Sequence, residues 1–116
     1  MINYKQGDIV LVYFPESNLL TVKKRPAIVL QADDLKTGLE QIIIGMVTSN
    51  LERKGYPCRI FVDISGDTGK QTGLLSNSVI MTDNVVTVRS SEIYQKIGIF
   101  IEENRLKDAL KYTFGV

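Results

Sequence analysis

The chain has 116 residues, a length that fits one compact domain over residues 1–116 but is too short for two. Hydrophobic residues make up 44% and charged residues 23%, which is typical of a globular protein and excludes a disordered or collagen-like chain. With 14 Lys and Arg against 13 Asp and Glu, the net charge is +1, so a site for a polyanion must come from local clustering of cations.

The sequence contains no histidine and one cysteine, Cys58. This excludes Ser-His-Asp triads, His-activated cysteine nucleophiles and structural zinc sites, so any chemistry must use Arg, Lys, carboxylates, hydroxyls or backbone. Cys58 begins the alternating stretch "CRIFVDI" and is expected to be a small core residue. Because no disulfide can form within the chain and no apolar run suits a signal peptide or a membrane span, we expect a soluble, cytoplasmic protein.

Short apolar runs, separated by clusters of Gly, Pro, Asn and Asp, dominate the first hundred residues. They predict strands at residues 8–14, 27–32, 41–48, 59–64, 78–82, 85–88 and 96–100. Many short strands without helices between them indicate an antiparallel sheet curled into a small barrel, so the fold class is predicted to be mainly β (α+β).

The end of the chain has a helical pattern instead. Acidic residues precede, and lysines follow, a set of apolar residues at helical spacing: Leu106, Ala109, Leu110 and Phe114. We therefore expect an amphipathic helix over residues 102–114 that closes the domain, and a short helical turn in "SSEIYQK" before the last strand.

The stretch "SGDTGKQTG" contains a Gly-Lys pair that invites a phosphate-loop interpretation. A Walker A loop needs a glycine five residues before the Gly of that pair and a Ser or Thr directly after the Lys. Those positions hold Ile64 and Gln71, so the motif fails, and we expect a flexible hairpin loop.

Two groups of cations flank turn segments of the predicted barrel. Lys23, Lys24 and Arg25 end a loop that begins at Pro15, and the second group flanks the loop between two neighbouring strands: Arg53, Lys54 and Arg59. Such loops can converge at one end of a small barrel and form a basic cleft for a polyanion backbone. On charge alone, two solvated basic loops explain the same pattern equally well.

Arg25 differs from its lysine neighbours because Pro26 follows it and favours an extended backbone at Arg25. A guanidinium held in this way can bind a phosphate in bidentate geometry, although a structural ion pair is the alternative role. Thr48 and Ser49 end the third predicted strand, where hydroxyls usually form turns or caps. If they lie beside Arg25, arginine and hydroxyls form a plausible site for phosphoryl transfer.

The order of these motifs resembles that of the MazF/PemK type II toxin endoribonucleases. Members open with a Gly-Asp-Ile-Val strand, here "GDIVLVYF", continue with an Arg-Pro strand, here "KKRPAIVL", and end the third strand in Thr-Ser or Thr-Thr, here "VTSN". The later segments "GLLSNSVI", "DNVVTV" and "KIGIF", followed by the helix, are also similar, so the resemblance covers essentially the whole chain.

The resemblance implies a homodimeric, SH3-like barrel that cuts single-stranded RNA without metal or other cofactor, through attack of a 2'-hydroxyl on the adjacent phosphate. Arg25 would contact the scissile phosphate and assist proton transfer, Thr48 would orient or stabilise that phosphate, and Ser49 would be a second candidate hydroxyl. Lys23 and Lys24 would add affinity for RNA. The implied partner is a small cognate antitoxin whose disordered tail lies across the cleft.

The general base is unassigned at this point. An arginine is a poor base at neutral pH, and three carboxylates are candidates: Glu16, Glu52 and Asp83.

Two other functions remain open. A CcdB-like gyrase-binding poison shares this fold and needs no catalytic residues, and the C-terminal "FGV" is similar to its aromatic-Gly-Ile ending. A noncatalytic SH3-like RNA-binding module is the second alternative, because a fold does not fix a function. The pairing of "RPAIVL" with "TS" favours the ribonuclease.

Overall fold

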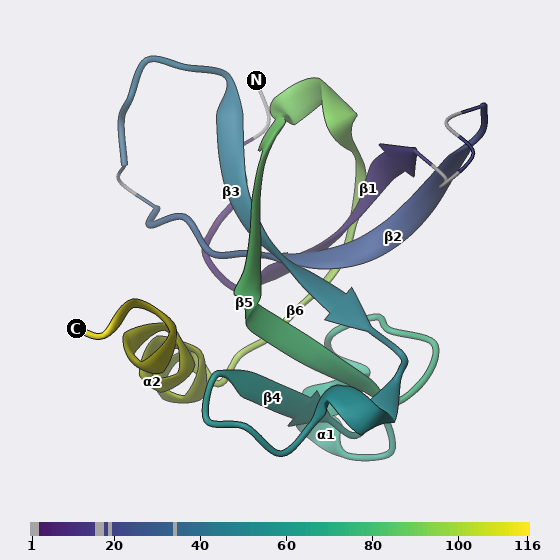
Figure 1. Ribbon diagram of the computed structural model, residues 1–116, viewed down its shortest axis with the longest axis vertical. Coiled ribbons are helices and arrows are strands. Elements are labelled where there is room, and N and C mark those ends of the chain that lie inside the picture. Colours follow the sequence, from purple (N-terminus) through teal and green to yellow (C-terminus); the bar gives the residue numbers. More distant parts are fainter. Residues whose placement is uncertain (1–2, 16–17, 19, 34) are drawn as a thin grey trace.

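The computed structural model describes residues 3–15, 18, 20–33 and 35–116. Its main element is a six-stranded antiparallel sheet, followed at the C-terminus by the helix α2 (Figure 1). The strands are ordered β4-β5-β3-β2-β1-β6. Their bounds are β1 Asp8–Pro15, β2 Val22–Val29, β3 Gln41–Thr48, β4 Arg59–Val62, β5 Ser78–Arg89 and β6 Ile93–Ile99, and α2 covers Glu103–Phe114. The predicted mainly β class with a C-terminal helix is confirmed.

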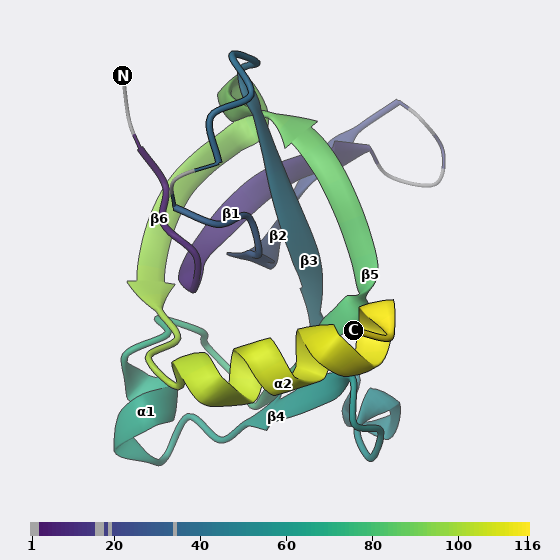
Figure 2. The ribbon, with the colours of Figure 1, turned by 90° about the vertical axis from the view of Figure 1, so that its left-hand side faces the viewer.

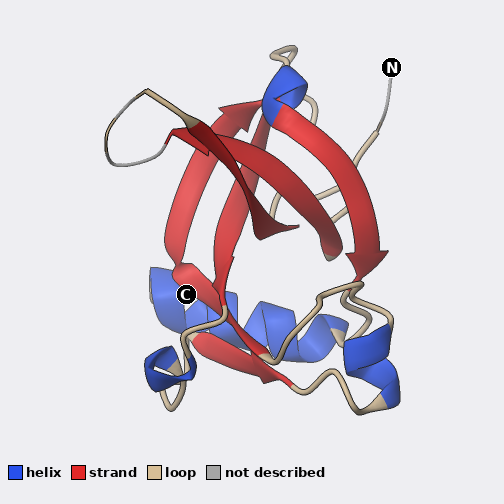
Figure 3. Cartoon of the chain, turned by 90° about the vertical axis from the view of Figure 1, so that its right-hand side faces the viewer, coloured by secondary structure: helices blue, strands red, loops and turns tan. Residues whose placement is uncertain are grey.

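The sheet is strongly curled (Figures 2 and 3). Side chains from both of its faces are buried. Neighbouring residues of a strand point to opposite faces, so Ile9 and Ile28 join the core cluster that packs beneath α2. Val10 and Ala27 instead join the cluster on the other face, within the curl of the strands. Burial on both faces explains why runs such as "AIVL" are apolar at every position rather than at alternate ones.

Strand β2 begins earlier than predicted. Residues 23–25 were expected in a loop, but they are paired with β1, with Arg25 opposite Val12 and Lys24 opposite Tyr13. The loop assignment for Lys23, Lys24 and Arg25 is therefore wrong, because cross-strand pairing extends the strand through these polar positions. The strand also ends at Val29 rather than at residue 32.

Strand β5 is continuous where two strands were predicted, at residues 78–82 and 85–88. The turn-like residues between them form a bulge, because Gly45 of β3 pairs with Val85 whereas the next residue, Met46, pairs with Met81. Three residues of β5 are thus inserted opposite one step of β3: Thr82, Asp83 and Asn84.

Shorter differences occur elsewhere. Strand β4 ends at Val62, β6 begins at Ile93, and the expected turn before β6 is a 3-10 turn, Ser90–Glu92. The Gly-Lys segment is more ordered than predicted, because it forms the one-turn helix α1, Asp67–Lys70. A Cβ at Gly69 would overlap the carbonyl of Asp63, so this turn packs directly against the backbone that leaves β4.

The helix α2 ends as its sequence predicts. Gly115 adopts a left-handed conformation, with φ 69°, and its N–H donates to the carbonyl of Lys111 at 2.8 Å. Leu106 and Ala109 are buried against the sheet. No helix in the part of the chain that the structure describes combines the length and apolarity needed to cross a membrane.

Candidate active site

An open cavity of about 740 Å³ lies beside the first half of β2, the end of β3 and the bulge of β5. It is lined by residues from several segments of the chain. The polar residues of its lining are Lys23, Lys24, Arg25, Thr48, Ser49, Ser76, Ser78 and Asn84, and the apolar ones include Phe14, Met46, Leu74, Leu75 and Ile97. The cavity thus brings together five residues that the sequence predicted to be functional: Lys23, Lys24, Arg25, Thr48 and Ser49.

The β2–β3 register explains how Arg25 and Thr48 reach the same cavity. The last paired residues at this end are Ala27 and Met46. Arg25 and Thr48 each lie two residues beyond that pair, so they share a face with Ala27 and Met46, both of which are buried in the cluster within the curl. Continued in register, Arg25 lies opposite Thr48 at the end of this face.

The Thr48 hydroxyl is held by the turn that follows β3. Its Oγ1 accepts a hydrogen bond from the backbone N–H of Asn50 at 3.1 Å. Asn50 in turn caps the next 3-10 turn, because its Oδ1 accepts from the N–H of Glu52 at 3.1 Å. The oxygen of Thr48 is therefore fixed as an acceptor, and its O–H proton is left to donate toward the cavity.

Among the residues that the structure describes, no acid balances the positive charge of the cavity. None of the ion pairs in the described part of the chain involves Lys23, Lys24 or Arg25. The described residues that line the cavity include no Asp or Glu. A phosphate oxyanion is the natural complement of three exposed cations beside two hydroxyls.

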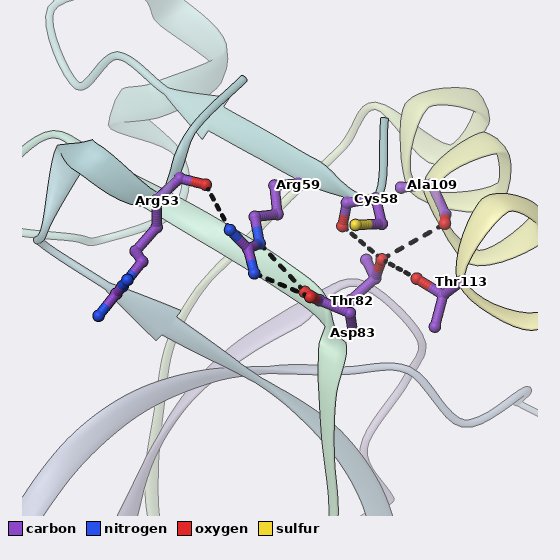
Figure 4. A network of polar contacts seen from close by, with 7 residues as sticks. All are labelled: Arg53, Cys58, Arg59, Thr82, Asp83, Ala109 and Thr113. Atoms are coloured by element: carbon purple, nitrogen blue, oxygen red, sulfur yellow. Dashed lines mark hydrogen bonds and ion pairs between the residues drawn. The ribbon is translucent and has the colours of Figure 1, made fainter. Parts of the chain in front are cut away.

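The second basic cluster does not line this cavity. Arg59 instead forms a two-pronged contact with Asp83, Nη2 to Oδ2 at 2.9 Å and Nε to Oδ1 at 3.3 Å, and also donates to the carbonyl of Arg53 (Figure 4). The hydrogen bond to Asp83 raises the pKa of Arg59. Lys54 lies over the ring of Phe61, 5.1 Å from its centroid. RNA binding by Arg53, Lys54 and Arg59 stays a prediction.

Two of the three candidates for general base, Glu52 and Asp83, also lie outside the lining. The guanidinium of Arg59 lowers the pKa of Asp83 and occupies both of its carboxylate oxygens, which makes Asp83 a weak base. Glu52 lies in the exposed 3-10 turn after β3. Glu16 lies outside the residues that the structure describes.

Asn84 and Leu75 are among the cavity residues that sequence reasoning missed. Asn84 enters it because of the β5 bulge, and the only signal for this was the turn-like "TDN" within an apolar segment. Leu75 is 97% exposed at the cavity, although a leucine in a turn segment gave no reason to expect this. Its neighbour Gly73 has φ +73°, and a Cβ there would overlap the carbonyl of Ile97, so this segment packs closely on β6.

Several solved structures share this fold at low sequence identity. An endoribonuclease in complex with its cognate antitoxin, from a mycobacterial species, has a TM-score of 0.73 at 14% identity, covering 97% of this chain and 96% of that chain. A MazE–MazF structure from Deinococcus radiodurans has a TM-score of 0.72 at 18% identity, covering 99% of both chains. The Mycobacterium tuberculosis toxin MazF-mt6 has 0.68 at 20% identity, covering 92% and 97%. At these identities the similarity shows the fold.

Comparison of the sequence with known proteins and with family models is more specific than the shared fold. No curated protein matches the chain. The family model described as the PemK-like, MazF-like toxin of type II toxin-antitoxin systems matches residues 5–112. Because this match covers nearly the whole chain, the chain belongs to the PemK-like, MazF-like toxins of type II toxin-antitoxin systems.

Proposed function

We propose that this toxin is an endoribonuclease that cleaves single-stranded RNA at the cavity between β2, β3 and the β5 bulge. The observation that carries the proposal is the placement of Arg25, within β2, and Thr48, at the end of β3, on one face of neighbouring strands in a cavity with three cations. A guanidinium and a hydroxyl set on strands are held more rigidly than they would be on free loops, as stabilisation of a developing charge requires.

In the proposed reaction, the 2'-oxygen of one nucleotide forms a bond to the adjacent phosphorus while the bond from phosphorus to the 5'-oxygen breaks. The products are a 2',3'-cyclic phosphate and a 5'-hydroxyl. The 2'-hydroxyl proton leaves as the new bond forms, and the 5'-oxygen takes up a proton. Arg25 stabilises the negative charge on the phosphoryl oxygens, and Thr48 donates its O–H to one of them. Ser49 is a second donor at the same strand end.

Two exposed surfaces of the toxin support two protein partners, an antitoxin and a second copy of the chain. A cognate antitoxin would neutralise the toxin by covering the basic cavity, and the endoribonuclease and MazF structures with antitoxins support such a partner. A homodimer is supported by the apolar side chains exposed at the end of α2, Phe114 at 60% and Val116 at 87%. Acting on RNA, the toxin would work in the cytoplasm.

Product chemistry tests the proposed reaction. Purified protein is incubated with a long single-stranded RNA in EDTA, and the ends of the fragments are mapped and their terminal phosphates identified. We expect discrete cuts with 2',3'-cyclic phosphate on one side and 5'-hydroxyl on the other. A matched RNA with 2'-deoxy nucleotides at the mapped sites should resist cleavage there. Cuts that persist without the 2'-hydroxyl would refute the mechanism.

A truncation separates this function from gyrase binding. Removal of Gly115 and Val116 takes away the two residues that follow α2, and neither of them lines the cavity. We expect the truncated toxin to keep its RNA cleavage. If the truncation abolished toxicity in cells while cleavage in vitro was unchanged, the toxic activity would lie with a protein target and not with RNA.

A further inference from the structure

Two tyrosines and a lysine form an exposed cluster on the face of the β1–β2 hairpin opposite to the Arg25 side. The rings of Tyr13 and Tyr94 contact each other edge to face, with centroids 5.6 Å apart and planes at 76°. Lys24 Nζ lies 3.6 Å from the centroid of the Tyr94 ring. The two rings remain 37% and 47% exposed, so the cluster, named here the Tyr13–Lys24–Tyr94 surface, is open to a ligand.

The sheet register places these side chains together. Tyr13 is directly opposite Lys24 in the β1–β2 pair. Across the other edge of β1, Val12 pairs with Ile93, and both of these side chains are buried in the core cluster within the curl. The residues that follow them, Tyr13 and Tyr94, therefore point to the outer face.

This surface is continuous with the cavity through Lys24, which belongs to both. The pairing of β2 with β3 ends at Ala27, so residues 23–25 lie on a strand whose described partner is β1 alone. A chain that leaves the cavity can pass around this edge of β2 and reach the outer face without crossing the sheet. The contact with Tyr94 of β6 holds the ammonium group of Lys24 over β1 on the outer face, where a free lysine would be mobile.

We propose that the Tyr13–Lys24–Tyr94 surface is a second RNA contact, which binds nucleotides flanking the cleaved position; it rests on the proposed ribonuclease function. Exposed tyrosine rings stack on bases of any sequence, and a cation beside them binds the connecting phosphate, which is the combination that single-stranded nucleic acid requires. An acidic peptide would gain from the lysine but not from paired rings. The contact therefore adds affinity for longer RNA without setting the sequence that is cut.

The test uses the full-length chain and single-stranded RNA oligonucleotides of about 3 to about 12 nucleotides, made 2'-O-methyl so that they cannot be cleaved. Binding is measured by fluorescence anisotropy for wild type, Tyr13→Leu, Tyr94→Leu and the matched controls Tyr13→Phe and Tyr94→Phe. The Phe variants keep the ring and should bind as wild type. The Leu variants should bind the longest oligonucleotides about fivefold or more weakly and the shortest ones unchanged. Circular dichroism verifies that each variant is folded.

A second variant tests the lysine without removing a ring. Lys24→Met should reduce the slope of log affinity against log salt by about 0.7, the value for one phosphate contact on a single strand. If both Leu variants bind long oligonucleotides as wild type does, the proposal is overturned, and the surface faces a protein instead. If both Leu variants bind long oligonucleotides as wild type does and wild type still cleaves RNA, the second RNA contact is refuted and the ribonuclease function stands. If wild type neither binds nor cleaves RNA, both proposals fail together.

Discussion

Arg25 and Thr48 each lie two residues beyond the last β2–β3 pair, Ala27 and Met46, and this register brings a guanidinium and a hydroxyl to the same cavity. The two residues are 23 positions apart in the sequence, so their meeting depends on the antiparallel pairing of the two strands. The proposed chemistry depends on this juxtaposition.

The Thr48 hydroxyl can be tested by a change that keeps its shape. In Thr48→Val the branched side chain stays and the O–H is lost, so we expect the rate of RNA cleavage to fall about 10²-fold, as for removal of one charge-stabilising donor. Thr48→Ser keeps the hydroxyl and should retain most of the activity. Cleavage rates are measured under single-turnover conditions. Equal rates for the Val and Ser variants would exclude Thr48 from the reaction.

Thr82 joins α2 to the sheet. Its Oγ1 lies 2.6 Å from the carbonyl of Cys58 and 2.8 Å from Oγ1 of Thr113, and Thr82 is fully buried (Figure 4). Thr82→Val removes the hydrogen bonds of this hydroxyl to Cys58 and Thr113, while the Cys58 carbonyl keeps the backbone N–H of Thr82, so the free energy of unfolding should fall by about 1–3 kcal/mol. Urea denaturation of wild type and variant measures this loss of stability. Because the two hydroxyls contact each other, Thr113→Val combined with Thr82→Val should destabilise by less than the sum of the single changes.

Gly73 supports the segment that carries Leu75 at the cavity. Gly73→Ala places an alanine in the left-handed backbone conformation, which should lower the free energy of unfolding by about 1–2 kcal/mol. The new Cβ also overlaps the carbonyl of Ile97, which should lower it by roughly 1–3 kcal/mol more. Gly38→Ala is the matched control, since Gly38 has a similar φ of +76° and no atom within 4 Å of the position that a Cβ would take. The difference between the two variants in thermal unfolding isolates the overlap. Equal losses of stability in both variants would refute the close packing of this segment on β6.

The Arg59–Asp83 pair should make stability depend on acid pH. Hydrogen bonding to Arg59 lowers the pKa of Asp83 below its ordinary 3.8, so the pair stabilises the fold above that pH, and this contribution is lost as the pH falls through the lowered pKa. Asp83→Asn should therefore be less stable than wild type at pH 6, and the difference should shrink as the pH falls through the lowered pKa of Asp83. The midpoints of urea denaturation, measured at a series of pH values from pH 6 downward, quantify this stability difference. Arg59→Gln should reproduce it, and a difference that persists unchanged at low pH would contradict the assignment.

The sequence predicted the fold class, the strand bounds of β3, and the five residues that the cavity brings together. It did so because local signals were strong: Pro26 keeps Arg25 extended, and hydroxyls follow an unbroken apolar strand. The β5 bulge and Asn84 were not predictable, since they arise from how β3 and β5 align across residues distant in the sequence. The same nonlocal pairing gives Arg59 a carboxylate partner, which charge clustering alone could not reveal.

The most direct test of the proposed ribonuclease site replaces Arg25. Wild type, Arg25→Ala and Lys107→Ala are compared for single-turnover cleavage of one long single-stranded RNA in EDTA; Lys107 is an exposed cation of α2, so its variant matches the change in charge. We expect Arg25→Ala to stay folded and to lose about 10²-fold to 10³-fold in rate, while Lys107→Ala cleaves as wild type does. Cleavage by Arg25→Ala at the wild-type rate, with the same fragment ends, would contradict the assignment of Arg25 to the active site.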